Sequence, residues 1–174
     1  MDNIILGLLL LSKRTIYQLH ERIEKGINLM YSSSIGSIQA GIKKLLSAGY
    51  IDVEEVFEDG KLKKFYFITQ KGQDYFFGWI NEPLKEQTPR NPELIKLYFM
   101  GFANKGNQRK SIEKHIEFLK TKYSLLCSIC NDSNSLVVPD DKKGIFEFQL
   151  ASAIYGRDLL KFNIDWFENL LTKI

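Results

Sequence analysis

The chain has 174 residues, enough for one sizeable hydrophobic core or two small ones, and 44% hydrophobic with 26% charged residues is typical of a globular protein. Its formal net charge of +3 permits a polyanionic partner without demanding one. The longest apolar run, residues 4–11, is too short to cross a bilayer and lacks the flanking charges of a secretory signal, so we expect a cytoplasmic protein with no membrane partner.

Two helices are predicted at the start of the chain. Residues 2–11 are apolar nearly all round, which indicates a buried helix that Asp2 or Asn3 could cap. Residues 16–25 carry apolar side chains spaced three and four apart, with Thr15 as the predicted cap and Gly26 as the stop.

The third predicted helix has one apolar face and one nearly bare face. Ser32, Ser33 or Ser34 can cap it, and Gly49 fits a left-handed stop. Its apolar stripe consists of Ile35, Ile38, Ile42 and Leu45. The opposite face has small side chains at its leading end and lysines one turn later, whereas soluble helices usually cover this face with long charged side chains.

A β-hairpin and a fourth helix follow. Residues 51–57 and 63–69 are rich in β-branched and aromatic residues, and the Asp59-Gly60 pair between them is a strong hairpin signal. Thr69 can cap a fourth helix that carries Tyr75, Phe76, Trp79 and Ile80. Three helices followed by a two-stranded wing predict a winged helix-turn-helix.

The second half of the chain is predicted to be helical. Residues 81–91 are proline-rich and read as a linker. Beyond them the apolar spacing is helical, except for a break at "NKGNQ" (residues 104–108) and a polar loop at residues 131–144. One long stripe lies on a helix of about 22 residues, formed by Ile112, Ile116, Leu119, Tyr123, Leu126 and Cys130. We therefore predict a mainly α protein with a winged helix-turn-helix DNA-binding domain at residues 1–80, a linker at 81–91 and a helical dimerisation domain at 92–174.

A helix that enters the major groove of DNA cannot carry bulky side chains on its outer face, and this requirement explains the bare face. Gln39 could pair bidentately with adenine, and the lysines of the helix and of the wing could contact phosphates. The predicted DNA-binding residues are Ser34, Gly36, Ser37, Gln39, Ala40, Lys43, Lys44, Lys61, Lys63 and Lys64. The alternative is that another helix of the protein packs on the small residues. Residues 1–80 hold ten Lys and Arg against nine Asp and Glu, so affinity per domain should be modest and a dimer is needed.

Three stretches together resemble the PadR family of bacterial transcriptional regulators: "ILGLLLLSKRTIYQLHERIE", "GSIQAGIKKLLSAGYI" and "KKFYFITQKGQDYF". They are similar to the family's opening helices, its Gly-Ser-Ile-Tyr recognition helix and its Tyr-x-Ile-Thr-x-x-Gly strand. The resemblance covers about residues 4–80 and adds Tyr17 to the predicted DNA-binding residues. It implies a dimeric repressor, often released by a small and frequently aromatic effector. The chain departs from the family pattern at Gln39-Ala40, where Tyr-Pro is usual, and at Ile16, where Gly is usual.

The last predicted helix is apolar on more than one face, because Ile154, Phe167 and Leu171 lie off its main stripe. One face can pack within the subunit and the other against a twin in a symmetric dimer. The predicted dimerisation residues form the main stripe: Phe148, Tyr155, Leu159, Phe162, Trp166 and Leu170. Aromatic residues at that seam could also line an effector pocket, for which Trp79 and Trp166 are the candidates.

Enzymatic and metal chemistry find no support. Cys127 and Cys130 lack the second ligand pair that a metal site needs, and we interpret them as buried structural residues. No catalytic triad motif, phosphate-binding loop or dinucleotide fingerprint is present, so we expect no cofactor and no enzyme. The sequence thus predicts a sequence-specific DNA-binding regulator, a dimeric repressor with a palindromic operator. The alternative is a winged-helix protein-interaction module that does not bind DNA.

Overall fold

The computed structural model describes residues 1–25, 34–58, 60–84, 92–133 and 135–174. The chain divides into two compact units, Met1–Glu86 and Gln87–Ile174. Both units are mainly helical, and the first contains the predicted wing, so the predicted fold class is confirmed. Most of the predicted linker, residues 85–91, lies outside the described residues.

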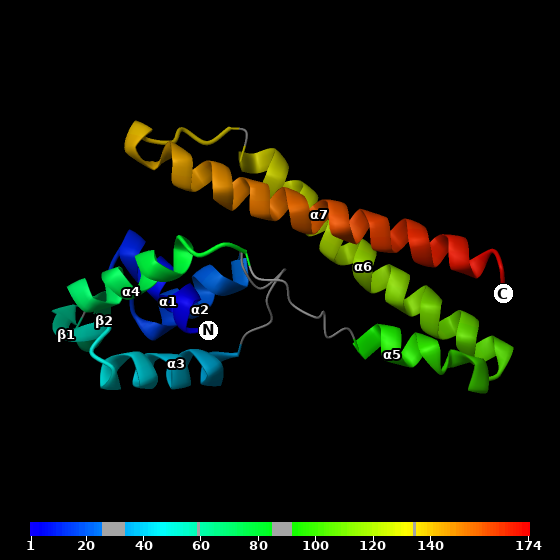
Figure 1. The fold of residues 1–174 in the computed structure, drawn as a ribbon, viewed down its shortest axis with the longest axis horizontal. Helices are drawn as coiled ribbons and strands as arrows, with labels where there is room; N and C mark the ends of the chain where they lie inside the picture. Colours follow the sequence, from blue (N-terminus) through cyan, green and yellow to red (C-terminus); the bar gives the residue numbers. More distant parts are fainter. Residues whose placement is uncertain (26–33, 59, 85–91, 134) are drawn as a thin grey trace. The chain divides into compact units, whose positions relative to one another are not determined.

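The first unit is a three-helix core with a hairpin and a fourth helix (Figure 1). Its elements are α1 (Asp2–Leu11), α2 (Ile16–Lys25), α3 (Ile35–Ser47), β1 (Ile51–Glu58), β2 (Lys61–Ile68) and α4 (Gln70–Ile80). One core is shared by the three helices and the base of the hairpin. Its fully buried side chains include Ile5, Leu6, Leu19, Ile23, Ile38 and Leu45. As predicted, α1 is buried.

Side-chain caps fix where three of these helices begin. The Thr15 hydroxyl accepts a hydrogen bond from the Gln18 amide at 3.2 Å, and the Gln18 side chain accepts one from the Thr15 amide at 2.9 Å. Ser34 is the cap of α3, since its hydroxyl accepts from the Ser37 amide at 3.2 Å. Thr69 caps α4 through the Gly72 amide at 3.1 Å. The predicted caps at Thr15 and Thr69 are confirmed.

Of the other predicted helix ends, the structure contradicts one and confirms another. The predicted cap of α1 is wrong, because Met1 is the N-cap and makes no side-chain bond, while Asp2 lies inside the first turn and pairs with Lys44 instead. Gly49 has the predicted left-handed conformation, with φ of 71°. Ser32, Ser33 and Gly26 lie outside the described residues.

The two strands pair antiparallel from Ile51 opposite Ile68 to Glu58 opposite Lys61. Gly60 in the turn has φ of 73°, which glycine adopts without strain; Asp59 lies outside the described residues. The segment before α2 also joins the hairpin, because Arg14 and Tyr66 exchange backbone hydrogen bonds of 3.0 and 2.8 Å. The wing is therefore tied to the helical core at its base.

Gly72 explains the spacing in the "ITQKG" segment. A Cβ atom at this position would lie 2.0 Å from the Tyr50 carbonyl oxygen, so α4 can approach the end of α3 this closely only with glycine here. The Thr69 hydroxyl donates to the Gly49 carbonyl at 2.8 Å while it caps the Gly72 amide. Threonine and glycine three residues apart thus dock α4 onto the α3–β1 turn.

The second unit is built on two long antiparallel helices (Figure 1). Its elements are α5 (Pro92–Tyr98), the short 3-10 helices η2 (Met100–Phe102) and η3 (Asp140–Lys142), α6 (Lys105–Ser133) and α7 (Lys143–Leu171). The core joins Ile112, Ile116 and Leu119 of α6 to Ile164 and Phe167 of α7. Five of the six residues in the predicted α6 stripe are buried and Tyr123 is partly buried. The helix is longer than predicted, because the Asn104 side chain accepts a hydrogen bond from the Asn107 amide and so starts it within the expected break.

No helix in the described part of the chain is long and apolar enough to cross a membrane.

Candidate nucleic-acid interface

The bare face of α3 is exposed. Gly36, Gln39, Ala40, Lys43 and Lys44 are all open to solvent, while Ser37 is half-buried. The opposite face consists of Ile38, Ile42 and Leu45, which pack into the core as predicted. Ile35, predicted to share that apolar stripe, is instead 46% exposed at the first turn of the helix.

Two glycines on α3 differ in whether packing within the protein requires a small residue at their position. A Cβ atom on Gly41, which is buried, would lie 2.7 Å from the Cδ1 atom of Ile5, so this glycine lets α3 pack against α1. A Cβ atom on Gly36 would meet, among the described residues, only the Ser34 hydroxyl at 3.9 Å. No packing contact among the described residues of the first unit therefore requires a small residue at position 36.

The serines at the start of α3 are already used by the helix itself. The Ser37 hydroxyl donates to the Ser34 carbonyl at 2.7 Å and accepts from the Ser34 amide at 3.1 Å. A contact between Ser37 and DNA would have to exchange one of these bonds. Gln39 and Ala40 lie on the exposed side of the same helix and take no part in these hydrogen bonds between the two serines.

The two lysines of α3 differ in their surroundings. Lys44 donates to the Asp2 carboxylate at 2.6 Å, and this hydrogen bond together with the negative charge of Asp2 raises the pKa of Lys44 above its ordinary value. Lys43 is exposed on the neighbouring surface. A phosphate that binds Lys44 therefore competes with Asp2.

The wing carries both signs of charge. Lys64 forms an ion pair with Glu55 on the opposite strand at 3.0 Å, which raises the pKa of Lys64. Glu54 is paired with Lys13, which precedes α2. Lys61 is exposed, and Lys63 is half-buried. Part of the positive charge predicted to meet phosphates is thus balanced within the wing.

An exposed apolar pair at the wing was not predicted from the sequence. Phe57 and Leu62 stand opposite one another in the hairpin and are 75% and 60% exposed. They lie on the same face of the hairpin as Val53 and Tyr66, which pack into the core. Phe57 and Leu62 are nearer the turn of the hairpin and are not part of the core. The strict alternation of the strands, counted from the buried Ile51, could have revealed them. Tyr17 on α2 is a further exposed aromatic residue, at 72%.

The predicted dimerisation stripe of α7 is largely exposed in the single chain. Phe148 and Phe162 are among the most exposed, and Leu170 is the exception because it packs partly against the core of the second unit. The buried residues of this helix lie outside the predicted stripe: Ala153, Gly156, Ile164 and Phe167. In the described part of the chain, α7 therefore carries a row of large exposed apolar side chains.

The two tryptophans proposed for an effector pocket belong to different units. Trp79 lies 5.6 Å from Phe76 between ring centres, and Trp166 lies 5.0 Å from Phe167. Each is about two-fifths exposed. Their joint role stays a prediction.

The cysteines are free thiols on α6. Cys130 is buried, as predicted, whereas the prediction that Cys127 is buried is wrong, because its side chain is only half-buried. A hydrogen bond with Cys127 raises the pKa of the Tyr123 phenol. Within the described residues there is no group of three His, Cys, Asp or Glu side chains that could hold a metal ion.

Comparison with known proteins gives relatives in sequence and in fold. No family model matches the chain. The negative transcriptional regulator PadR of Bacillus subtilis (strain 168) is 24% identical over 123 residues, which are 69% of this chain and 67% of PadR. The crystal structure of Bacillus subtilis PadR with operator DNA matches with a TM-score of 0.78 and 20% identity, covering 99% of this chain and 97% of that one.

Two further solved structures extend the comparison. PadR in complex with p-coumaric acid matches with a TM-score of 0.74 at 17% identity, covering 99% of this chain and 96% of that one. The Vibrio cholerae virulence activator AphA matches with a TM-score of 0.77 at 16% identity, covering 99% and 96% of the two chains. The resemblance predicted from the three sequence stretches is confirmed, and PadR, the relative found by sequence, is a transcriptional regulator.

Proposed function

Because the chain is PadR-like in sequence and in fold, we propose that it is a transcriptional regulator that binds double-stranded DNA as a homodimer. The observation that carries this proposal is the exposed slim face of α3, where no described residue of the same unit packs closely enough on Gly36 to require glycine. The major groove is just wide enough for an α-helix. Small side chains at the leading end of α3 would let the helix enter the groove.

The residues of α3 divide between reading bases and holding phosphates. Gln39 can form two hydrogen bonds to adenine, and the Ala40 methyl group can contact the methyl group of thymine. Lys43 and Lys44 lie one turn later, where the helix would pass the DNA backbone. Tyr17, Ser34 and Ser37 complete the proposed contacts from the two helices. Tyr-Pro is usual in the family at Gln39-Ala40, so the operator sequence should be this protein's own.

The wing supplies the remaining contacts, through Lys61, Lys63 and Lys64. Phosphate contacts provide most of the affinity of such proteins, and base contacts provide the choice of site. Two α3 helices in a symmetric dimer would address half-sites about 34 Å apart, roughly one helical turn. The operator should therefore be palindromic.

The proposed dimer contact is the exposed row of α7. Leaving large apolar side chains in water is unfavourable, since burial of one contributes roughly 1.5–3 kcal/mol. Phe148, Tyr155, Leu159, Phe162 and Trp166 provide such a row on one helix face. A two-fold axis lets one such row cover another, because both partners present the same surface. Leu170 would sit at the edge of this contact.

The proposals that this protein represses transcription and is released by an effector are based on what its relatives do. Bacillus subtilis PadR is a negative regulator and has been solved with p-coumaric acid, whereas AphA is an activator with the same fold. The chain resembles PadR in sequence as well, which favours repression by occupation of an operator. Release by a small aromatic effector and a place in the cytoplasm, where bacterial DNA lies, follow from the same proposal.

A winged-helix module that binds a protein instead of DNA is the second candidate. It is favoured by the ion pairs Lys44–Asp2 and Lys64–Glu55, which balance positive charge on the very surface that would face phosphates. The deciding experiment is fluorescence anisotropy with duplexes tiled over the region upstream of the protein's own gene, with shuffled duplexes as controls. Tight binding to one palindromic duplex supports the regulator; equal and weak binding to all duplexes contradicts it.

A further inference from the structure

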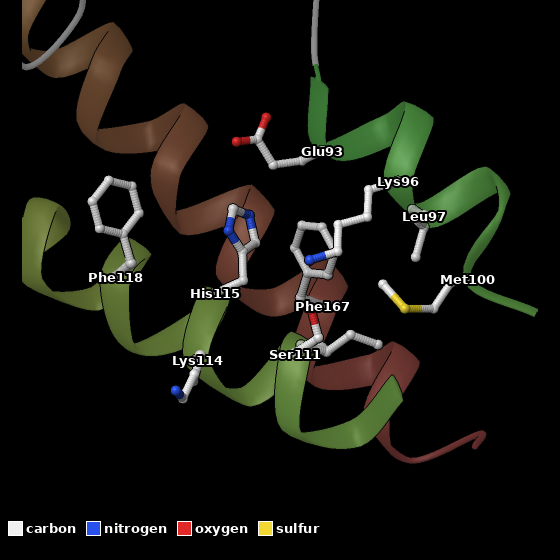
Figure 2. A pocket seen from close by; sticks show the side chains of 10 residues that line it. Glu93, Lys96, Leu97, Met100, Ser111, Lys114, His115, Phe118 and Phe167 are labelled. Atoms are coloured by element: carbon white, nitrogen blue, oxygen red, sulfur yellow. The ribbon is translucent and has the colours of Figure 1, made fainter. Parts of the chain in front are cut away.

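The proposed contacts leave a hollow in the second unit and an apolar pair on the wing without a role. The hollow, of about 390 Å³, lies between α5, α6 and α7. Figure 2 shows Glu93 and Lys96 of α5 together at its rim, so its charges select neither an anion nor a cation. The apolar pair is Phe57 and Leu62, called the wing-tip pair below, and its place in the hairpin indicates a specific use.

The wing-tip pair stands far out on the hairpin. Phe57 and Leu62 lie opposite one another, four residues beyond Val53 and Tyr66, which pack into the core on the same face. A strand rises by about 3.3 Å per residue, so the wing-tip pair lies about 13 Å beyond these core residues. The hairpin thus presents two apolar side chains at its outer end.

An ion pair separates the wing-tip pair from the core. Glu55 and Lys64 occupy the register position between the two, with 3.0 Å between the Lys64 ammonium and the Glu55 carboxylate. In the described part of the hairpin, Phe57 and Leu62 are the only large apolar side chains that are exposed. The wing-tip pair is therefore a separate apolar end rather than an open margin of the core.

The small size of the wing-tip pair favours DNA over a protein as its partner. A stable protein interface takes roughly 20–30 residues from each side, and the wing tip offers two apolar ones. Proteins that bend DNA from the minor groove insert individual apolar side chains such as Phe or Leu between neighbouring base pairs. The minor groove is about 6 Å wide, which admits side chains but no helix.

The charge around the wing tip also fits a duplex. Residues 57–64 contain three lysines against two acidic residues, a net charge of +1. Because side chains alternate along a strand, Lys64 shares the face of the wing-tip pair, whereas Lys61 and Lys63 lie on the opposite face. Phosphates line both walls of a groove, so lysines on both faces can hold the end of the hairpin there.

We propose that the wing-tip pair enters the minor groove and parts one base-pair step, with Phe57 as the inserted side chain and Leu62 as its support. This inference rests on the proposed function and adds a reading of sequence that needs no hydrogen bond to a base. Pyrimidine–purine steps such as TA and CA unstack more easily than A-tracts. The wing therefore prefers such a step at a fixed distance from the bases that α3 contacts, since both elements belong to the first unit.

The test uses the full-length protein and its operator, with 2-aminopurine placed at one position at a time. The fluorescence of this base rises when it loses its stacking neighbours. We expect wild-type protein to raise the fluorescence severalfold at one step in each half-site. Phe57→Thr, which keeps a residue of high strand propensity, should remove the rise, whereas Phe57→Tyr keeps the ring and should retain it.

Two titrations complete the test. Replacing the parted step by an A-tract step should weaken wild-type binding about tenfold, the usual effect of one unfavourable base pair, and Phe57→Thr should bind both duplexes equally. The salt slope separates insertion from a structural role. It should be the same in Phe57→Thr and in wild type, because the lysines of an intact hairpin still meet the phosphates.

The inference is overturned if no position of the bound operator gains fluorescence, or if Phe57→Thr keeps the gain. A salt slope that flattens in Phe57→Thr also overturns it, because the pair would then only hold the two strands of the hairpin together. Failure of the proposed function is observed separately, as equal and weak binding of the wild type to every duplex, which overturns both.

Discussion

The ammonium of Lys44 in α3 lies 2.6 Å from the carboxylate of Asp2 in the first turn of α1. Asp2 is thus an intramolecular competitor for one of the phosphate contacts proposed for α3. The pair raises the pKa of Lys44 above its ordinary value, so the lysine is charged at neutral pH and loses its charge only as the pH rises through that raised value. Near neutral pH, salt and DNA, rather than protons, should decide whether the pair is broken.

Removing the competitor should strengthen DNA binding. We expect Asp2→Asn to tighten binding to the operator severalfold, because Lys44 no longer has to leave a carboxylate. The salt slope should steepen by up to about 0.9, the value of one additional phosphate contact. Anisotropy titrations between low and moderate salt measure both quantities. Unchanged affinity and slope would show that Lys44 does not contact DNA.

Gly36 and Gly41 offer a matched pair on one helix. Gly36→Leu should leave stability unchanged or raise it by up to about 1 kcal/mol, the propensity cost of glycine in a helix. It should also abolish operator binding, because a leucine side chain would stand where α3 is to enter the groove.

Gly41→Leu should do the reverse to stability, lowering it by at least 1–3 kcal/mol, roughly the cost of overpacking a core. Its Cβ atom alone would lie 2.7 Å from Ile5. Urea unfolding and anisotropy on both variants provide the comparison. Full operator binding by Gly36→Leu would rule out the groove as the reason for the bare face.

The wing lysines should contribute to DNA affinity independently of the DNA sequence. Replacing Lys61, Lys63 and Lys64 together by Gln should weaken binding to operator and shuffled duplexes alike. It should flatten the salt slope by about 0.9 for each phosphate that the variant no longer neutralises. Because Lys64 is paired with Glu55, we expect Lys64 to contribute less than one full phosphate contact to this change in slope. A slope equal to that of wild type would remove the wing from the interface.

The exposed stripe of α7 predicts a change in oligomeric state. Trp166→Glu should yield monomers in sedimentation velocity, because a carboxylate cannot be buried against the apolar row of a twin without a large desolvation cost. Gln149→Glu introduces the same charge on an exposed residue of the same helix, about 100° around the helix axis from Trp166 and so outside the stripe, and should remain dimeric. A dimer that persists in Trp166→Glu would place the contact elsewhere.

Gly72 should be intolerant of any side chain. Gly72→Ala is expected to lower the free energy of unfolding by roughly 1–3 kcal/mol or more, since the new Cβ atom would lie 2.0 Å from the Tyr50 carbonyl oxygen and backbone has to move. Thermal unfolding of this variant beside Gly78→Ala, where nothing lies within 4 Å of a Cβ atom, gives the comparison. Equal melting temperatures would contradict the docking role assigned to Gly72.

Local rules of the sequence determined the order of the elements and several of their ends. Thr15, Thr69 and Gly49 act through bonds to residues a few positions away, or through their own backbone, so the chain alone predicts them. The α6 stripe was predictable for the same reason, since periodicity needs no knowledge of the partner helix. The family resemblance rested on three such local segments.

Tertiary structure decided what depends on residues far apart in the chain. Asp2 was predicted to cap α1 and instead pairs with a lysine 42 residues later. Periodicity identified two apolar faces on α7, but only packing against α6 revealed that Phe167 and Ile164 face inward while the Phe148 to Trp166 row stays outside. The same holds for Gly41 and Gly36, which look alike in the sequence, because the space around a Cβ atom is set by neighbours that the local pattern does not name.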